Sequence, residues 1–137
     1  GGARRPGPGA VGVSYIRVVD DEQVIRTSLK RLLERNGYDV AEAGSVDEAL
    51  LQHQIDGFDL IISDLRLPGL PGTALIDKAG TTPVLIMTSF ASIRSAVDAV
   101  KAGAADYIAK PFDHDDMLLT VDRILRERLL VRQTALW

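Results

Sequence analysis

Carboxylate, hydroxyl and ammonium side chains follow four of the five short apolar runs in this 137-residue sequence. In chain order they are Asp20, Asp21, Asp64, Thr88 and Lys110. Carboxylates that are brought together repel one another, by about 4 kcal/mol for a pair ~4 Å apart at an effective dielectric of ~20. A cation must offset that repulsion, and oxygen ligands alone favour a hard divalent ion such as Mg²⁺, with Mn²⁺ as an alternative.

A metal-bound cluster of this kind can carry out phosphoryl transfer. Asp64 can act as the nucleophile toward a phosphoryl donor, which forms an acyl phosphate. The Lys110 ammonium supplies a compact positive charge for the oxygens of the transferred group. The Thr88 hydroxyl can donate a hydrogen bond to the new phosphate, and the small side chain of Ser89 leaves the approach open. Asp64, Lys110 and Thr88 are therefore the predicted catalytic residues.

Each of these residues also has an ordinary structural interpretation. An acidic pair after a strand is usually a helix N-cap with a solvated neighbour. A threonine such as Thr88 suits a turn, and a lysine before a proline, as at Lys110, usually lies on the surface. Their combination at four strand ends is what favours chemistry. A haloacid-dehalogenase-like phosphatase also uses a strand-end aspartate with Mg²⁺, but it requires a second acid two residues later, where this chain has Arg66.

The five apolar runs are the predicted strands that position these residues, over residues 15–19, 38–43, 58–63, 83–87 and 106–109. Helices are predicted between them, including one with a capping box at Ser45 and Glu48 that ends near Gln54, a short one over 72–79, and a last one capped by Asp113. The alternation favours a flavodoxin-like, doubly wound α/β fold with a five-stranded parallel sheet of order 2-1-3-4-5 and helices on both faces. The carboxyl ends of its strands meet at one edge, where ligands bind.

The composition of the chain indicates one domain, flanked by an N-terminal and a C-terminal segment of different character. Residues 1–14 are rich in glycine and proline and are expected to be a flexible extension or a cloning remnant, residues 15–126 the domain, and residues 127–137 the end of the last helix or a linker. The net charge of −3 gives no electrostatic basis for binding nucleic acid or an anionic membrane. Because the chain has no cysteine and no apolar run long enough to span a bilayer, we expect a soluble, cytoplasmic protein.

The chain resembles the receiver domains of two-component response regulators over roughly residues 15–126. The matching motifs are Asp20-Asp21, the stretch 64–69, Thr88-Ser89 and the stretch 103–112. The resemblance implies that Asp64 accepts a phosphoryl group from a sensor histidine kinase. It also implies that Mg²⁺ is held by Asp20, Asp21, Asp64 and the backbone carbonyl of Arg66, and that the Lys110-Pro111 peptide bond is cis.

The resemblance further implies a conformational switch, in which Thr88 moves toward the phosphate and the ring of Tyr107 turns inward. Arg66 and Phe90 lie two residues past Asp64 and Thr88, so we expect them to influence the lifetime of the phosphate. Such a domain is not a conventional enzyme, although it catalyses its own phosphorylation and dephosphorylation.

The sequence of residues 90–112 is most similar to that of receivers attached to AAA+ transcriptional activators of the nitrogen-regulator type. We therefore expect a fused output domain outside this chain, and dimerisation through the fourth and fifth helices or through the C-terminal helix. The chain departs from the family pattern at Pro71, where an acid is common, and in the short segment between Asp64 and Thr88. The alternative function is a receiver-like interaction module that phosphorylation does not regulate.

Overall fold

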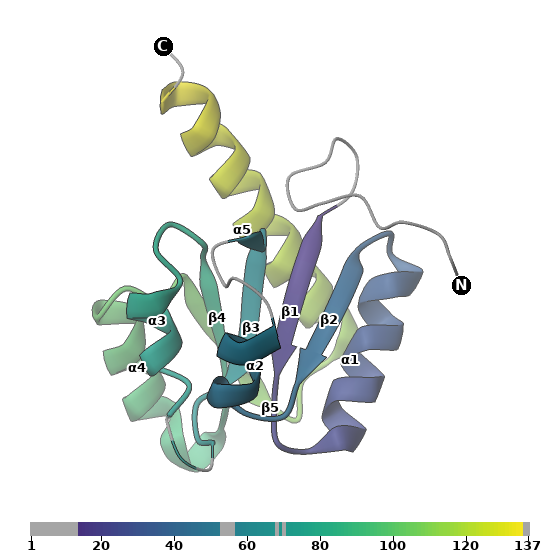
Figure 1. Ribbon diagram of the computed structural model, residues 1–137, viewed down its shortest axis with the longest axis vertical. Helices are drawn as coiled ribbons and strands as arrows, with labels where there is room; N and C mark the ends of the chain where they lie inside the picture. The colour runs from purple at the N-terminus through teal and green to yellow at the C-terminus, as the bar shows by residue number, and fades with distance from the viewer. Residues whose placement is uncertain (1–13, 53–56, 68, 70, 136–137) are drawn as a thin grey trace.

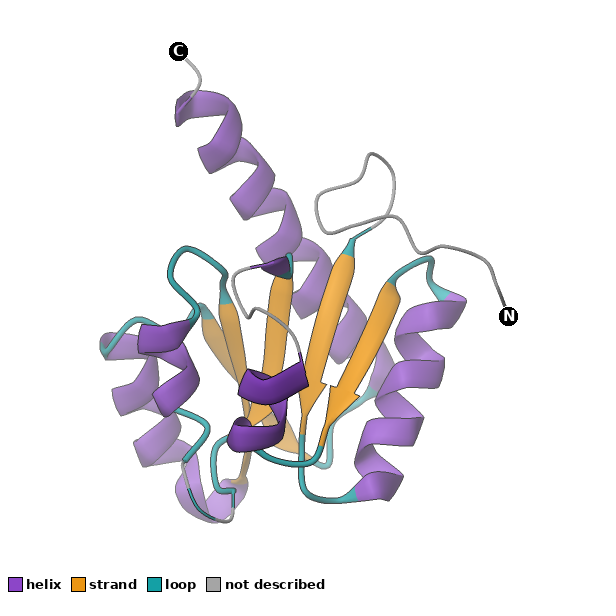
Figure 2. Cartoon of the chain, in the orientation of Figure 1, coloured by secondary structure: helices purple, strands orange, loops and turns teal. Residues whose placement is uncertain are grey.

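Five parallel strands form one sheet in the computed structural model (Figures 1 and 2). The structure describes residues 14–52, 57–67, 69 and 71–135. The sheet has the order β2-β1-β3-β4-β5, which confirms the predicted doubly wound α/β fold. The strands are β1 (Tyr15–Val19), β2 (Asp39–Ala43), β3 (Leu60–Asp64), β4 (Val84–Ser89) and β5 (Asp106–Lys110).

Helices cover both faces of the sheet, as predicted (Figure 2). One core cluster joins the sheet to α2 (Val46–Gln52), α3 (Ala74–Lys78) and α4 (Ile93–Lys101). The other joins it to α1 (Gln23–Arg35) and α5 (His114–Ala135). Apolar side chains therefore enclose the sheet on both sides, and polar side chains at the strand ends reach the edge where the loops lie.

Two strands continue beyond their apolar runs into the polar residues that the sequence places at their ends. Strand β4 extends past Met87 to Ser89, and β5 extends past Ala109 to Lys110. The ladder between them continues because Thr88 pairs with Ala109 and Ser89 pairs with Lys110. Backbone hydrogen bonding between β4 and β5 therefore keeps the polar residues Thr88, Ser89 and Lys110 within the strands. The pattern of apolar side chains does not indicate such pairing. Strand β3 also starts at Leu60 rather than at residue 58.

The capping box at the start of α2 is present, with one change from the expected pairing. The Glu48 amide donates to Ser45 Oγ at 3.0 Å, and the Glu48 carboxylate accepts from the amide of Gly44 at 2.7 Å. The predicted end of this helix near residue 54 lies outside the described residues. Helix α3 is short, as predicted, but it begins at Ala74 rather than at Gly72, because residues 71–73 form a turn ahead of it.

Helix α5 continues well past residue 126 and ends at Ala135. Its C-terminal half projects beyond the sheet (Figure 1). The Arg128 guanidinium donates to the backbone carbonyls of Phe58 and Asp59, at 3.3 and 3.0 Å, and so ties this half of α5 to the amino end of β3. Residues 1–13 and 136–137, which include most of the predicted extension and the end of the predicted linker, lie outside the described residues. None of the described helices combines the length and the apolarity that a bilayer crossing demands.

Candidate functional site

Three carboxylates meet at the carboxyl edge of the sheet. Oxygens of Asp20, Asp21 and Asp64 all lie within 4.8 Å of one another. Strands β1 and β3 are neighbours, and Val19 pairs with Ser63. The next residues along the chain, Asp20 and Asp64, therefore lie close together. Asp20 is fully buried, Asp21 is exposed and Asp64 is half-buried. The structure therefore brings together the three acids that the sequence identifies.

Lys110 lies between two of these acids and completes the cluster. Its Nζ is 2.7 Å from Asp20 Oδ2 and 3.4 Å from Asp64 Oδ1. The other oxygen of Asp20 accepts the amide of Glu22 at 2.8 Å, which fixes the carboxylate. Burial lowers the pKa of Lys110, but the hydrogen bond and charge of Asp20, together with the charge of Asp64, outweigh burial and raise that pKa. The ammonium is therefore held in its charged form.

Asp64 has a raised pKa in this environment. Burial is the main cause, and the charges of Asp20 and Asp21 add to it, while Lys110 opposes both effects. One ammonium thus leaves the ionised cluster with uncompensated negative charge, which a divalent cation would neutralise. All the side-chain donors are oxygens, one of them on an exposed acid, and such a set fits Mg²⁺ with room for water and a phosphate.

Replacing Asp64 by asparagine is expected to stabilise the metal-free domain at neutral pH, by on the order of 1 kcal/mol. Because folding raises the pKa of Asp64, its ionised form disfavours the folded state, whereas below the unfolded-state pKa of about 4 the group is protonated in both states. The gain in unfolding free energy should be present at pH 7 and vanish as the pH falls toward about 4. Urea denaturation across this range measures it, with exposed Asp98→Asn as the control. A gain that is independent of pH would contradict this assignment of charge.

The remaining predicted site residues make contacts outside the acid cluster. The Thr88 hydroxyl donates to the carbonyl of Ser89 at 3.3 Å. Tyr107 pairs with Ile86 in the β4-β5 ladder and is partly exposed, and Phe90 is 66% exposed. The Lys110-Pro111 peptide bond is cis. The Nε of Arg66 donates to Ser92 Oγ at 3.0 Å.

Two residues that support the site were not identified from the sequence. Arg26 donates to the backbone carbonyl of Asp20 at 2.5 Å and pairs with Glu42 at 3.5 Å, which holds the end of β1. Gly72 packs so closely against β3 that a Cβ at this position would lie 2.0 Å from the carbonyl oxygen of Asp64. An arginine one turn into a helix and a glycine after a proline are both common in proteins. Neither feature alone therefore identifies a residue that supports a functional site.

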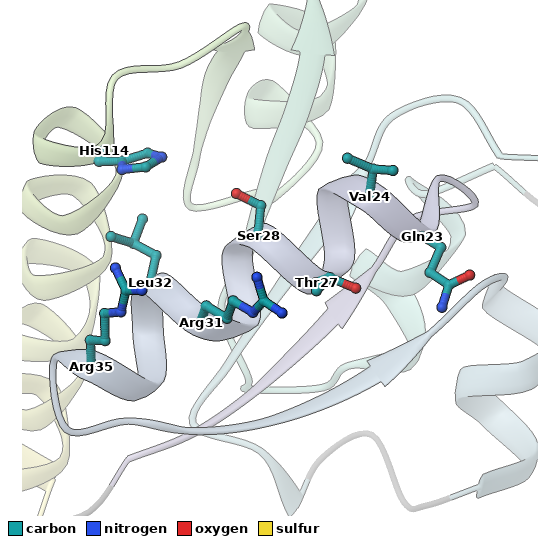
Figure 3. Close-up of a pocket in the computed structure, with 8 residues that line it drawn as sticks. All are labelled: Gln23, Val24, Thr27, Ser28, Arg31, Leu32, Arg35 and His114. Carbon is teal, nitrogen blue, oxygen red and sulfur yellow. The ribbon is translucent and has the colours of Figure 1, made fainter.

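A groove of about 480 Å³ follows the outer face of α1, separate from the acid cluster (Figure 3). Figure 3 shows Val24 toward one end of the groove and Leu32, Arg35 and His114 together at the other. His114 is the first residue of α5, so the groove joins the two helices that cover this face of the sheet. Its start lies next in the chain to the acidic pair, because Gln23 follows Asp21 by two residues.

The chain matches the family described as the response regulator receiver domain over residues 16–122. It is 41% identical over 114 residues to the transcriptional regulatory protein ZraR of Salmonella typhimurium, a match that covers 80% of this chain and 26% of that protein. It is 38% identical over 114 residues to the transcriptional regulatory protein ResD of Bacillus subtilis, covering 81% of this chain and 48% of that protein. The chain thus spans about a quarter of the length of ZraR.

Solved structures of the same kind share the fold. NtrX from Brucella abortus, in complex with ADP, superposes with a TM-score of 0.84 at 32% identity, covering 90% of this chain and 29% of that one. A response regulator receiver domain protein from Clostridium thermocellum superposes with a TM-score of 0.79 at 27% identity, covering 86% of this chain and 98% of that one. The likeness to the second protein extends over almost its whole length.

Proposed function

This chain belongs to the response regulator receiver domain family, and from that premise we propose that it is a phosphorylation-dependent switch with Asp64 as its phosphoacceptor. The observation that carries the proposal is the cluster of three carboxylates with the Lys110 ammonium between two of them. A cluster that is deficient in positive charge and open on the side of Asp21 suits an incoming metal and phosphoryl donor.

Mg²⁺ would be held by the carboxylates of Asp20, Asp21 and Asp64, with the backbone carbonyl of Arg66 as a further ligand. When bound, the ion supplies positive charge to the oxygens of the phosphoryl group. The hydrogen bond from the Glu22 amide and the contact with Lys110 keep Asp20 in place, which leaves Asp64 as the carboxylate that reacts.

In the proposed reaction, a carboxylate oxygen of Asp64 attacks the phosphorus of a phosphohistidine on a sensor histidine kinase. The phosphorus-nitrogen bond breaks as the new phosphorus-oxygen bond forms, and the histidine leaves. Lys110, 3.4 Å from Asp64 Oδ1, neutralises charge on the transferred group. The Thr88 hydroxyl would exchange the Ser89 carbonyl for a phosphoryl oxygen, and Tyr107 would move behind it as the second part of the switch.

Incubation with acetyl phosphate and Mg²⁺, followed by intact-mass measurement, tests the proposal. We expect one phosphoryl adduct on the wild-type chain and on Asp98→Asn, which changes an exposed aspartate of α4, and none on Asp64→Asn. Addition of a chelator should abolish the adduct. An unmodified wild-type chain under these conditions would instead favour the interaction module that phosphorylation does not regulate.

We propose that the kinase docks along the groove on α1, because a donor that reaches Asp64 must contact the surface beside the acidic pair. The groove offers Val24, which is 79% exposed, as an apolar contact, and Arg31 and Arg35 for acidic groups of the partner. Since the ZraR relatives are transcriptional regulatory proteins several times longer than this chain, we also propose a fused transcriptional output domain and a cytoplasmic location.

Dimerisation through α4 and α5, or through the C-terminal part of α5, is a further part of the proposal. Three leucines of α5 are more than half exposed, namely Leu119, Leu129 and Leu130. Leu119 and Leu130 are eleven residues apart, which places them on one side of the helix. The pair Arg126 and Asp122, 3.1 Å apart, lies between them and could exchange partners with a second copy.

A further inference from the structure

The side chain of Arg66 connects the loop after β3 to the start of α4. Its Nε donates to Ser92 Oγ at 3.0 Å. Ser92 is only 7% exposed, whereas Arg66 is exposed, so the serine is the fixed partner and the arginine the movable one. In the part of the chain that the structure describes, no carboxylate forms an ion pair with this guanidinium. The contact therefore joins the loop after β3 to the segment between β4 and α4.

Ser92 is the N-cap residue of α4, yet its hydroxyl does not cap the helix. A serine at this position usually has extended backbone angles and accepts a hydrogen bond from the second or third helical amide. Here φ is −112° and ψ is 15°, and no side-chain capping bond forms. The first turn of α4 contains no acidic residue that could take over this role. The hydroxyl oxygen accepts from Arg66 and caps neither Arg94 nor Ser95, because Ser92 ends a short 3₁₀ helix, Phe90–Ser92, that runs directly into α4.

We propose that Ser92 is a positioning residue that holds the Arg66 guanidinium at the start of α4, and that phosphorylation of Asp64 releases it. This inference rests on the proposed function. A phosphoryl group on Asp64, two residues before Arg66, presents doubly charged acceptor oxygens. A guanidinium binds such oxygens more strongly than it binds a neutral hydroxyl, because both partners are charged and the contact can be bidentate.

Release of Arg66 leaves the Ser92 hydroxyl available to the first turn of α4. Rotation of the Ser92 ψ angle from 15° into the extended region, by roughly 100° or more, would open the preceding 3₁₀ turn and let the hydroxyl accept from Arg94 or Ser95, as N-cap serines do. Because Ser92 cannot lie in the 3₁₀ turn and in the extended region at once, the start of α4 has two backbone states, and phosphate selects between them. The contact thus links chemistry at β3 to the beginning of α4, one of the helices through which dimerisation is proposed.

Phosphorylation kinetics with acetyl phosphate and Mg²⁺ test this coupling. Because Ser92→Ala frees Arg66 to meet the anionic donor, we expect it to raise the phosphorylation rate about threefold, the order of effect of removing one competing hydrogen bond. Arg66→Ala should cancel this gain, so that Ser92→Ala changes the rate by less than about 1.5-fold in the Arg66→Ala background. Ser95→Ala, an exposed serine three residues later, is the matched control.

Amide hydrogen exchange of Arg94 and Ser95 gives a second measurement. Its dependence on phosphorylation would not change if Ser92 had only a structural role. In the wild-type chain, protection should rise on phosphorylation. In Arg66→Ala it should already be high without phosphate, since Ser92 is free to cap, and in Ser92→Ala it should stay low in both states.

An equal effect of Ser92→Ala in both backgrounds, or unchanged protection of the first turn on phosphorylation, would overturn the inference while leaving phosphorylation of Asp64 intact. Absence of any adduct on the wild-type chain would overturn the proposed function and this inference together, and the two failures are therefore distinguishable.

Discussion

Lys110→Ala is expected to slow the phosphorylation of Asp64 by about 100-fold or more while Mg²⁺ still binds. The ammonium is the one basic group seen between the acids, 2.7 Å from Asp20 and 3.4 Å from Asp64, among the residues that the structure describes. Removing it withdraws positive charge from the transferred group without removing an oxygen ligand of the metal. Mg²⁺ affinity should stay the same or rise, because a competing cation has been deleted.

The measurement is a pair of experiments on the same variant, namely phosphorylation rate by intact mass and Mg²⁺ affinity by titration calorimetry. Truncation also leaves Asp20 buried without its charged partner, which should cost about 3 kcal/mol in the absence of metal, so both assays are run at low temperature with folding checked by circular dichroism. Lys101→Ala, at an exposed lysine in the last turn of α4, is the control. A wild-type phosphorylation rate in Lys110→Ala would show that Lys110 takes no part in the phosphoryl transfer.

Gly72→Ala is expected to destabilise the domain by about 3 kcal/mol and to weaken Mg²⁺ binding. The added Cβ would lie 2.0 Å from the carbonyl oxygen of Asp64 and 2.8 Å from Ser63 Oγ. The carbonyl belongs to the backbone at the end of β3, which cannot rotate away as a flexible side chain can. The end of β3 must therefore shift, and Asp64 must shift with it.

Urea denaturation and Mg²⁺ titration measure these two effects of Gly72→Ala. Gly44→Ala is the matched control, because its Cβ would meet only the far ends of two flexible side chains, Glu48 at 3.1 Å and Arg26 at 3.4 Å. We expect Gly44→Ala to lose less than about 1 kcal/mol and to keep its metal affinity. If Gly72→Ala behaved like this control, the close approach to Asp64 would not constrain the site.

Much of the site follows from the sequence because it depends on where strands end. The carboxyl ends of parallel strands share an edge, so Asp20, Asp64 and Lys110 had to converge once their apolar runs were assigned to one sheet. The strand order and the helices on both faces follow in the same way from the alternation of short apolar runs with helical patterns. These features are set by short-range periodicity and by chain connectivity.

Features that depend on individual long-range contacts could not be predicted. The bond between Arg66 and Ser92 joins residues 26 positions apart, and nothing in the residue types indicates that this serine binds an arginine instead of capping its helix. The late start of α3 has a similar origin, since Gly72 is placed by its approach to the Asp64 carbonyl rather than by helix propensity. Such contacts depend on packing between elements, which local patterns do not encode.

The most direct test of the central claim is to locate the phosphoryl group chemically. After incubation with acetyl phosphate and Mg²⁺, borohydride reduction converts an aspartyl phosphate into homoserine, and peptide sequencing by mass spectrometry shows which residue has changed. We expect conversion at Asp64 and at neither Asp20 nor Asp21. Conversion at another residue, or an unchanged peptide after full incubation, would contradict it.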